Sequence, residues 1–244
     1  AYESIVTILG GTVVNYSLDN EFKIDIEDIK NKIKDMNIKY LVLSLPSNPT
    51  GAILSKEEKN KLVQLIKEND VIVITDEIYE SLCYDEYHSV AQCNEIKDKI
   101  IYVGGFSKMF SMTGLRVGYY ACCEKLMNEI IKIHQYNVSC APSICQWAVY
   151  NGLKYGLQDV SYMKEVFNKR KNFVVSKLKD MGLDVVIPQG AFYVFPSIKK
   201  FNIPSEEFAL RLLHEEKVAC VPGTAFGVGG EGYLRLSYCY SDDE

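Results

Sequence analysis

The sequence predicts an α/β fold: a mostly parallel sheet flanked by helices, followed by a smaller α+β layer. In the first part of the chain, short apolar runs alternate with segments of helical periodicity. These runs are continuously apolar, which is typical of parallel strands covered on both faces. Near residue 156 the pattern changes to one long amphipathic segment followed by several short apolar runs. We therefore predict a large domain over residues 1–154 and a C-terminal small domain over residues 155–244.

The large domain is predicted to contain four strands joined by helices. Helical periodicity indicates a helix at 55–69, where Ser55 and Glu58 have the spacing of a capping box, and another at 124–137. The strands are expected at 38–46, 70–79, 99–107 and 115–123. Strands that alternate with helices favour parallel pairing.

The small domain is expected to begin with one long helix over 157–182, ended by Gly182. A second helix is expected at 205–217, and the tail "SDDE" is expected to be disordered. Strands are predicted at 183–188, 190–198, 218–222 and 233–238. The two glycines of "NGLKYG" place the domain boundary near residues 152–156.

Composition excludes several classes of function. The net charge is −5 and no block is rich in lysine or arginine, so a nucleic-acid partner is not expected. No apolar run approaches the ~18 residues of a membrane span, and "AYESIVTILGG" does not read as a signal peptide. The eight cysteines form no CxxC pair and only three histidines accompany them, so no metal site is predicted. Free thiols and a cytoplasmic location are expected.

Polar side chains follow the expected strands, where ligands of α/β sheets gather. Asn48 lies in "SNPTG", and Pro49 disfavours helical backbone at Asn48; alone, the segment could equally be a common Asn-Pro turn. Asp76 closes an apolar strand, where a carboxylate needs a partner. The alternative is that Asp76 caps a short helix beginning at Glu77, with Tyr79 one turn further on.

Three basic residues complete the set of candidates. Lys108 lies in "FSKMFSMTGLRVG" among aromatic residues, and a desolvated lysine can become a nucleophile; a snorkelling lysine is the alternative. Arg116 follows in the same motif, and alone it could be a surface residue. Arg235 lies between two leucines of "YLRLSY", so strand alternation turns its guanidinium to the other face, where it suits a carboxylate.

Taken together, these motifs resemble those of the class I and II pyridoxal-phosphate aminotransferases of fold type I. The motifs are "SNPTG", "DEIY", "SKMFSMTGLRVGY", "GAFYVFP" and "LRLSY", and the resemblance extends over essentially the whole chain. It implies pyridoxal 5'-phosphate as the cofactor and an L-amino acid and a 2-oxo acid as substrates. It also implies a homodimer.

The resemblance assigns a role to each candidate. It implies that Lys108 forms the Schiff base with the cofactor and moves the proton of the substrate, and that Asp76 pairs with the pyridine nitrogen. Asn48 and Tyr79 would hydrogen-bond the ring oxygen. Arg116 would bind the phosphate, with Ser107 as a further candidate, and Arg235 would bind the substrate carboxylate with Asn48 beside it.

The sequence also departs from the family pattern. Members often carry a phosphate-binding serine three residues before the lysine, where this chain has Gly105. The family's phosphate loop and ring-stacking aromatic residue are expected upstream of Ala1, so the chain resembles a C-terminal fragment. Weak cofactor retention and little turnover are expected of it alone, and a yellow band that shifts with an L-amino acid would contradict this.

Two other readings stay open. A cysteine-S-conjugate β-lyase of the same fold would keep Lys108, Asp76 and Arg235, although lyases of that group tend to carry histidine where this chain has Tyr79. A non-catalytic interaction module derived from the fold is the reading from another class. Substitution of Lys108 in the intact protein separates an enzyme from such a module.

Overall fold

The computed structural model describes residues 2–241 and divides the chain into two compact units. Unit 1 comprises residues 1–45, 54–78 and 87–150, and unit 2 comprises residues 46–53, 79–86 and 151–244. Two short segments that follow strands of unit 1 therefore belong to unit 2. The boundary that we predict after residue 154 stays a prediction.

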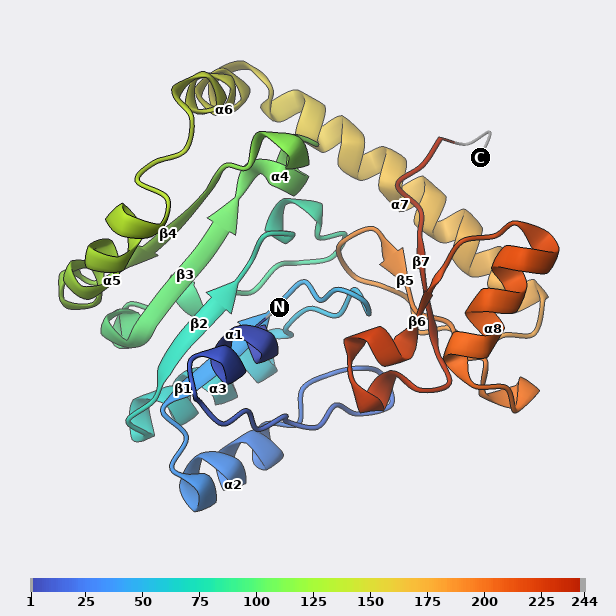
Figure 1. The fold of residues 1–244 in the computed structure, drawn as a ribbon, viewed down its shortest axis with the longest axis horizontal. Coiled ribbons are helices and arrows are strands. Elements are labelled where there is room, and N and C mark those ends of the chain that lie inside the picture. The colour runs from blue at the N-terminus through green and yellow to red at the C-terminus, as the bar shows by residue number, and fades with distance from the viewer. Residues whose placement is uncertain (1, 242–244) are drawn as a thin grey trace. The chain divides into compact units, whose positions relative to one another are not determined.

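Unit 1 is built on a four-stranded sheet in the order β1-β2-β3-β4 (Figure 1). The strands are β1 (Tyr40–Ser44), β2 (Ile72–Asp76), β3 (Ile100–Gly105) and β4 (Gly118–Cys122). β1, β2 and β3 are parallel, and β4 is antiparallel to β3. Each strand lies within a predicted apolar run, and the mostly parallel α/β sheet is confirmed.

Two helices build the core of unit 1 against this sheet. They are α2 (Ile26–Met36), whose N-cap Asp25 accepts from the backbone N–H of Asp28, and α3 (Lys56–Glu68). The capping box predicted from Ser55 and Glu58 is present at the start of α3. Apolar side chains of both helices pack in one cluster with strand residues; its fully buried members include Leu43, Leu62, Ile66, Val71 and Val73.

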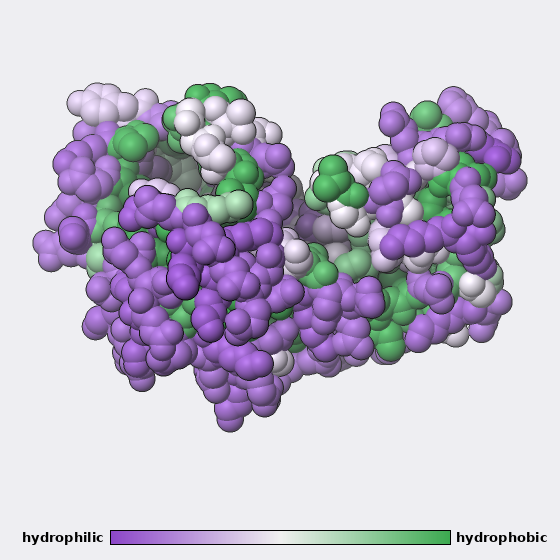
Figure 2. All heavy atoms as spheres, turned by 90° about the horizontal axis from the view of Figure 1, so that it is seen from below, coloured by the Kyte–Doolittle hydropathy of each residue, from purple (hydrophilic) through white to green (hydrophobic). Residues whose placement is uncertain are grey.

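Three further helices of unit 1 expose much apolar surface. They are α1 (Tyr2–Ile8), α5 (Glu124–Asn137) and α6 (Ser143–Tyr155), within which the chain passes into unit 2. Neither α1 nor α5 has a buried residue, and Ile133 and Tyr136 of α5 are 73% and 87% exposed. Figure 2 shows hydrophilic side chains over most of one face, with hydrophobic patches among them. Among the described helices, none is long and apolar enough to cross a membrane.

Unit 2 combines a small antiparallel sheet with three helical segments. Strands β5 (Tyr193–Val194), β6 (Val221–Pro222) and β7 (Leu234–Ser237) lie in the order β5-β7-β6. The long predicted helix is α7 (Leu157–Asp180), which ends before Gly182 at φ 72°. α8 (Ser205–Arg211) continues as a π-helical turn over Leu212–Glu216. Short 3-10 turns form other connections, such as Glu80–Leu82 in unit 2 and Thr113–Leu115 in unit 1.

One strand prediction in unit 2 is wrong. Residues 183–188, "LDVVIP", form no strand; the chain there is irregular and leads to Pro188. Pro188 instead packs against Gly51, at φ 71°, where a Cβ would come within 2.4 Å of the proline Cβ. Pro188, at the end of this stretch, thus packs against the 46–53 segment instead of joining a strand ladder. Of the predicted disordered tail, residues 242–244 lie outside the described residues.

Candidate functional site

In unit 1, the predicted site residues gather at one edge of the sheet. Asp76 is the last residue of β2 and pairs with Val103 of the parallel strand β3. β3 ends at Gly105 and leads directly into α4 (Phe106–Met109), which carries Ser107 and Lys108. Because β4 is antiparallel and Gly118 pairs with Gly105, the turn with Arg116 lies at the same edge. The carboxyl ends of parallel strands are where α/β sheets place their ligands.

Asp76 is held by two hydrogen bonds within unit 1. Its Oδ1 accepts from the backbone N–H of Ile78 at 3.2 Å, and its Oδ2 accepts from the hydroxyl of Tyr2 at 2.6 Å. The first bond closes a turn rather than capping an α-helix, because the residues after Asp76 form only turns and a 3-10 segment. The alternative reading of Asp76 as a helix cap is therefore wrong.

Tyr2 is a site residue that the sequence analysis missed. Burial raises the pKa of its phenol well above the usual value near 10, and the hydrogen bond and the charge of Asp76 raise it further. The phenol therefore stays protonated and donates to the carboxylate. Nothing in the pattern "AYESIVTI" marks Tyr2 as a partner of a residue 74 positions away. Only the tertiary fold reveals it.

The turn that joins α4 to β4 is stabilised by its own polar groups. The Thr113 hydroxyl donates to the Ser107 carbonyl at 3.1 Å, and Arg116 Nη1 donates to the Thr113 carbonyl at 2.9 Å. Arg116 is exposed and has a left-handed backbone at φ 55°. Lys108 is half-buried within α4. The residues predicted to bind the phosphate and the aldehyde of the cofactor thus lie in one short segment of the chain.

Gly105, where relatives of the resembled family often have serine, lies in a crowded position. A Cβ built there would come 2.7 Å from Cδ1 of Ile78 and 3.3 Å from Cα of Gly118. The Ile78 methyl could move, but the backbone of β4 could not do so easily. Close approach of β3 and β4 therefore explains why glycine stands at the end of this strand.

In unit 2, the structure brings together Asn48, Tyr79 and Arg235. Arg235 lies on β7 and donates from Nη1 to Oδ1 of Asn48 at 3.0 Å. Asn48 lies on the 46–53 segment, where the Asn48–Pro49 peptide bond is cis. The Nε atom of Arg235 is buried and has no hydrogen-bond partner among the described residues. A buried donor without an acceptor fits a site that receives an anionic group.

Aromatic rings surround this arginine. The guanidinium carbon of Arg235 lies 4.5 Å from the ring centroid of Tyr193 and 5.1 Å from that of Phe226. Tyr79 is buried, and its hydroxyl lies 2.9 Å from the hydroxyl of Tyr193. The sequence analysis quoted "GAFYVFP" only as a motif and gave Tyr193 and Phe226 no role. The strand alternation that singled out Arg235 could also have pointed to Tyr193, its diagonal neighbour on the adjacent strand.

A buried lysine lies in unit 2, and it serves packing. Lys171 of α7 is 8% exposed, and its Nζ lies 4.4 Å from the ring centroid of Tyr84. Burial lowers the pKa of this amine, an effect that the charge of Asp85 partly offsets. Tyr84 in turn donates to the carbonyl of Ala191. Lys171 thus anchors the 79–86 segment of unit 2 to α7.

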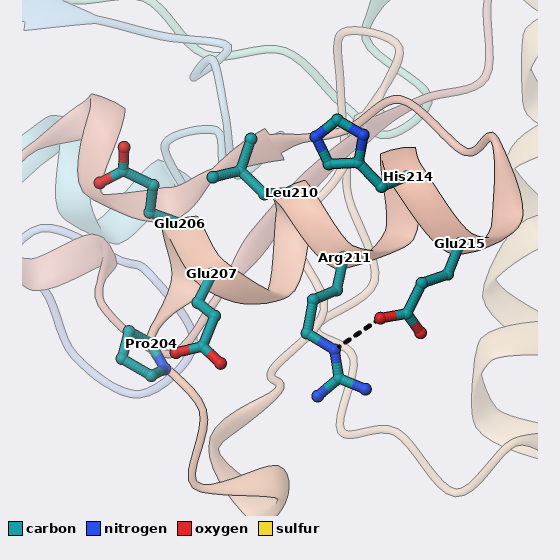
Figure 3. Close-up of a pocket in the computed structure, with 7 residues that line it drawn as sticks. All are labelled: Pro204, Glu206, Glu207, Leu210, Arg211, His214 and Glu215. Carbon is teal, nitrogen blue, oxygen red and sulfur yellow. Dashed lines mark hydrogen bonds and ion pairs between the residues drawn. The ribbon is translucent and has the colours of Figure 1, made fainter.

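An open surface groove follows α8 and its π-helical turn (Figure 3). Its side chains are mostly charged, and Arg211 Nε pairs with Glu215 Oε1 at 3.0 Å across one helical turn. The lining residues are Pro204, Glu206, Glu207, Leu210, Arg211, His214 and Glu215. None of the predicted site residues lines this groove, so it does not belong to the predicted site.

Comparison with known proteins identifies the class. The family model "Aminotransferase class I and II" matches residues 1–244, and the chain therefore belongs to the class I and II aminotransferase family. "Putative aminotransferase YugH" of Bacillus subtilis (strain 168) is 44% identical over 100% of this chain, and an aspartate aminotransferase of Pyrococcus abyssi is 37% identical over 98%. The chain spans 64% and 62% of the lengths of these two relatives.

Solved structures confirm fold type I for this chain. An aromatic aminotransferase from Pyrococcus horikoshii matches with a TM-score of 0.94 at 36% identity, covering 98% of this chain and 66% of that one. An aspartate aminotransferase from Thermotoga maritima matches with a TM-score of 0.91 at 38% identity, covering 99% and 63%. The family and the fold that the motifs predicted are thereby confirmed.

The residues present suit pyridoxal phosphate. Unit 1 offers a carboxylate at Asp76 for a ring N–H, an amine at Lys108 for an aldehyde, and a guanidinium at Arg116 for a phosphate. Unit 2 offers the phenol of Tyr79, the amide of Asn48 and the orphaned Nε of Arg235. These are the donor and acceptor types that the cofactor and an α-carboxylate require.

Proposed function

We propose that the intact protein is a pyridoxal-phosphate-dependent aminotransferase that transfers an amino group between an L-amino acid and a 2-oxo acid. The observation that carries the proposal is the common sheet edge of unit 1, where Asp76 ends β2, Lys108 follows β3 and Arg116 precedes the antiparallel strand β4. Membership of the aminotransferase family supports it. Pyridoxal phosphate, when bound, supplies the electron sink for the substrate carbanion.

The residues of unit 1 would hold the cofactor and move one proton. Lys108 Nζ would anchor the cofactor through its aldehyde and, once the amino group of the substrate displaces it, would take the proton from the substrate Cα and deliver it to the cofactor carbon C4′. Asp76, fixed by Tyr2 and by the Ile78 N–H, accepts from the pyridine N–H. Arg116 and the hydroxyl of Ser107 bind the phosphate, a role for which the Arg116 guanidinium exchanges its bond to the Thr113 carbonyl.

The residues of unit 2 would orient the ligands. Arg235 binds the α-carboxylate with its planar donors, one of which Asn48 already engages. Tyr79 and Asn48 donate to the ring oxygen. Orienting the substrate Cα–H bond relative to the ring is the part of catalysis that this group contributes.

The test uses the intact protein with pyridoxal phosphate, 2-oxoglutarate and a panel of amino donors that includes aspartate and phenylalanine. These two donors are chosen because the relatives include aspartate and aromatic-amino-acid aminotransferases. We expect formation of glutamate, lost in Lys108→Ala and retained in the control Lys97→Ala, an exposed lysine of unit 1. No transfer from any donor, or an active Lys108→Ala, would contradict the proposal. Release of pyruvate from a thioether amino acid without a 2-oxo acid would indicate the lyase instead.

The proposal extends to assembly and location. Exposed apolar residues on α5 and α6, among them Ile133, Tyr136 and Ile144, supply a surface of the kind that subunits bury on association. We expect a homodimer, which sedimentation equilibrium of the intact protein tests. All eight cysteines are free thiols in the structure, which suits a reducing compartment such as the cytoplasm.

A further inference from the structure

Tyr193 lies in unit 2 at the centre of contacts that link two predicted site residues. It begins the short strand β5 and is 7% exposed. In the antiparallel ladder its partner on β7 is Ser237. Arg235 is two residues from Ser237 on the same strand, so Tyr193 and Arg235 project from the same face of the sheet as diagonal neighbours.

The ring of Tyr193 supports the guanidinium of Arg235. The guanidinium carbon lies 4.5 Å from the ring centroid, which is within cation–π range. All N–H donors of a guanidinium lie in its plane, and a ring packed against the guanidinium restricts how that plane can turn. One of these donors already engages Asn48 at 3.0 Å, and the buried Nε has no partner among the described residues. The ring thus fixes the plane in which a carboxylate would be received.

The hydroxyl of Tyr193 reaches the other predicted residue. It lies 2.9 Å from the hydroxyl of Tyr79, whose ring meets that of Tyr193 edge-on at 5.9 Å between centroids. Phe192 packs edge-on against Tyr79 at 5.6 Å, so the phenol of Tyr79 is enclosed by two rings. A Tyr193 hydroxyl that donates to the oxygen of Tyr79 directs the Tyr79 O–H bond away from Tyr193.

We propose that Tyr193 is a positioning residue with two separable roles: its ring orients Arg235 for a carboxylate, and its hydroxyl sets the donor direction of Tyr79. The inference rests on the proposed function, in which Arg235 binds the α-carboxylate and Tyr79 the ring oxygen of pyridoxal phosphate. It gives a role to Tyr193, which belongs to the motif "GAFYVFP" but has no role in the sequence-based assignment. One side chain thereby links the substrate-binding and cofactor-binding groups of unit 2.

Two variants of the intact protein separate the roles. Tyr193→Phe keeps the ring and removes the hydroxyl, whereas Tyr193→Leu removes both. Tyr233→Phe is the matched control, because Tyr233 is a tyrosine of unit 2 that stacks on Phe195 and accepts from Lys199. Thermal unfolding establishes that each variant folds, and Tyr193→Met replaces Tyr193→Leu if the latter does not.

The first measurement is the dissociation constant for propionate, by calorimetry, with the cofactor removed. We expect Tyr193→Phe to stay within about twofold of the wild type and Tyr193→Leu to bind about 3- to 30-fold more weakly, the range of a cation–π contact. Equal propionate binding by Tyr193→Leu and the wild type would overturn the ring's role. This arm is independent of whether the protein transfers amino groups.

The second measurement is a pH titration of the protein loaded with pyridoxal phosphate. It gives the midpoint pH of the change in absorbance of the bound cofactor. We expect Tyr193→Phe to raise this midpoint by about 0.4 to 1 pH unit, the equivalent of one ordinary hydrogen bond, with the control unchanged. An unchanged midpoint in Tyr193→Phe would overturn the hydroxyl's role. If the wild type shows no cofactor absorbance at all, the proposed function fails, while the propionate arm still decides the role of the ring.

Discussion

The two arginines of the predicted site are held in different ways. Arg116 in unit 1 is exposed, and its guanidinium bonds a carbonyl of its own turn. Arg235 in unit 2 is half-buried, contacts the rings of Tyr193 and Phe226, and bonds Asn48 from a distant segment. A locally bonded, exposed arginine can exchange its partner for a phosphate at little cost. An arginine fixed by rings is preorganised for a ligand of defined orientation.

The same contrast extends to the groups around them. In unit 1 the backbone pairing of the strands positions the candidate site residues: it places Asp76, helix α4 and the turn with Arg116 at one edge of the sheet. In unit 2 the strands β5 and β6 have only two residues each, and side-chain packing positions the candidate residues instead. Substitutions should therefore affect the cofactor chemistry through unit 1 and ligand orientation through unit 2.

The largest effect is expected at Asp76 in unit 1. Asp76→Asn removes the charge that favours a protonated ring nitrogen, an effect of about 1 to 3 pKa units. We expect kcat of the intact protein to fall by about 10- to 1,000-fold. Asp70→Asn, an exposed aspartate before the other end of β2, is the control and should retain full activity. A kcat of Asp76→Asn equal to that of the control would remove Asp76 from the site.

A change at Arg235 should act on KM instead. Arg235→Lys keeps the charge but loses the planar donors and the contact of the guanidinium with the ring of Tyr193. Loss of one charge-assisted hydrogen bond corresponds to a rise of about 10- to 100-fold in KM for the amino donor. Arg116→Lys should leave this KM within about twofold and speed cofactor dissociation. If the two variants show the same kinetic pattern, the contrast between the arginines does not hold.

The buried carboxylate next to Asp76 should govern stability rather than catalysis. Glu77 is 3% exposed and accepts hydrogen bonds from the hydroxyls of Thr75, Tyr87 and Ser89. Glu77→Gln replaces one acceptor by a donor that cannot satisfy these hydroxyls, at a cost of about 1 to 3 kcal/mol in the free energy of unfolding. Urea denaturation measures this, with exposed Glu57→Gln as the control. Equal midpoints for the two variants would contradict the network's role.

A smaller effect is expected at high pH in unit 2. Burial raises the pKa of Tyr84 from 10.0 to about 12, so the unfolded chain loses this proton first as the pH rises. The tyrosine's contribution to stability is complete below pH 10 and decreases between pH 10 and 12, by about 1.4 kcal/mol per pH unit for one proton. Tyr84→Phe should flatten this decrease in urea denaturation series. An unchanged slope would mean that Tyr84 ionises equally in both states.

The sequence predicts the sheet edge of unit 1 well because its signals are local. The apolar runs of β1 to β4 and the Ser55–Glu58 capping box each depend on a few neighbouring residues, and the structure has them. The same holds for the end of α7 before Gly182 in unit 2. The motif around Lys108 likewise places Ser107 and Arg116 within one turn and its flanks. Local patterns thus sufficed to predict the strands of unit 1 and the order of its candidate site residues along the chain.

The missed features depend on contacts between distant residues. Tyr2 meets Asp76 across 74 positions, and Tyr79 meets Tyr193 across 114, so no local pattern reports either pair. The wrong strand at 183–188 has the same origin. Pro188 at its end packs on Gly51 of the distant 46–53 segment, and a short apolar run has the same sequence pattern whether it forms a strand or packs as irregular chain.

The proposed role of Lys108 as the lysine that binds pyridoxal phosphate covalently can be tested most directly. The intact protein is loaded with pyridoxal phosphate, reduced with borohydride, digested and mapped by mass spectrometry. We predict a single pyridoxyl modification on the peptide that contains Lys108. Modification of another lysine instead, such as Lys171, whose pKa is lowered by burial, would contradict the assignment, as would the absence of any modified peptide.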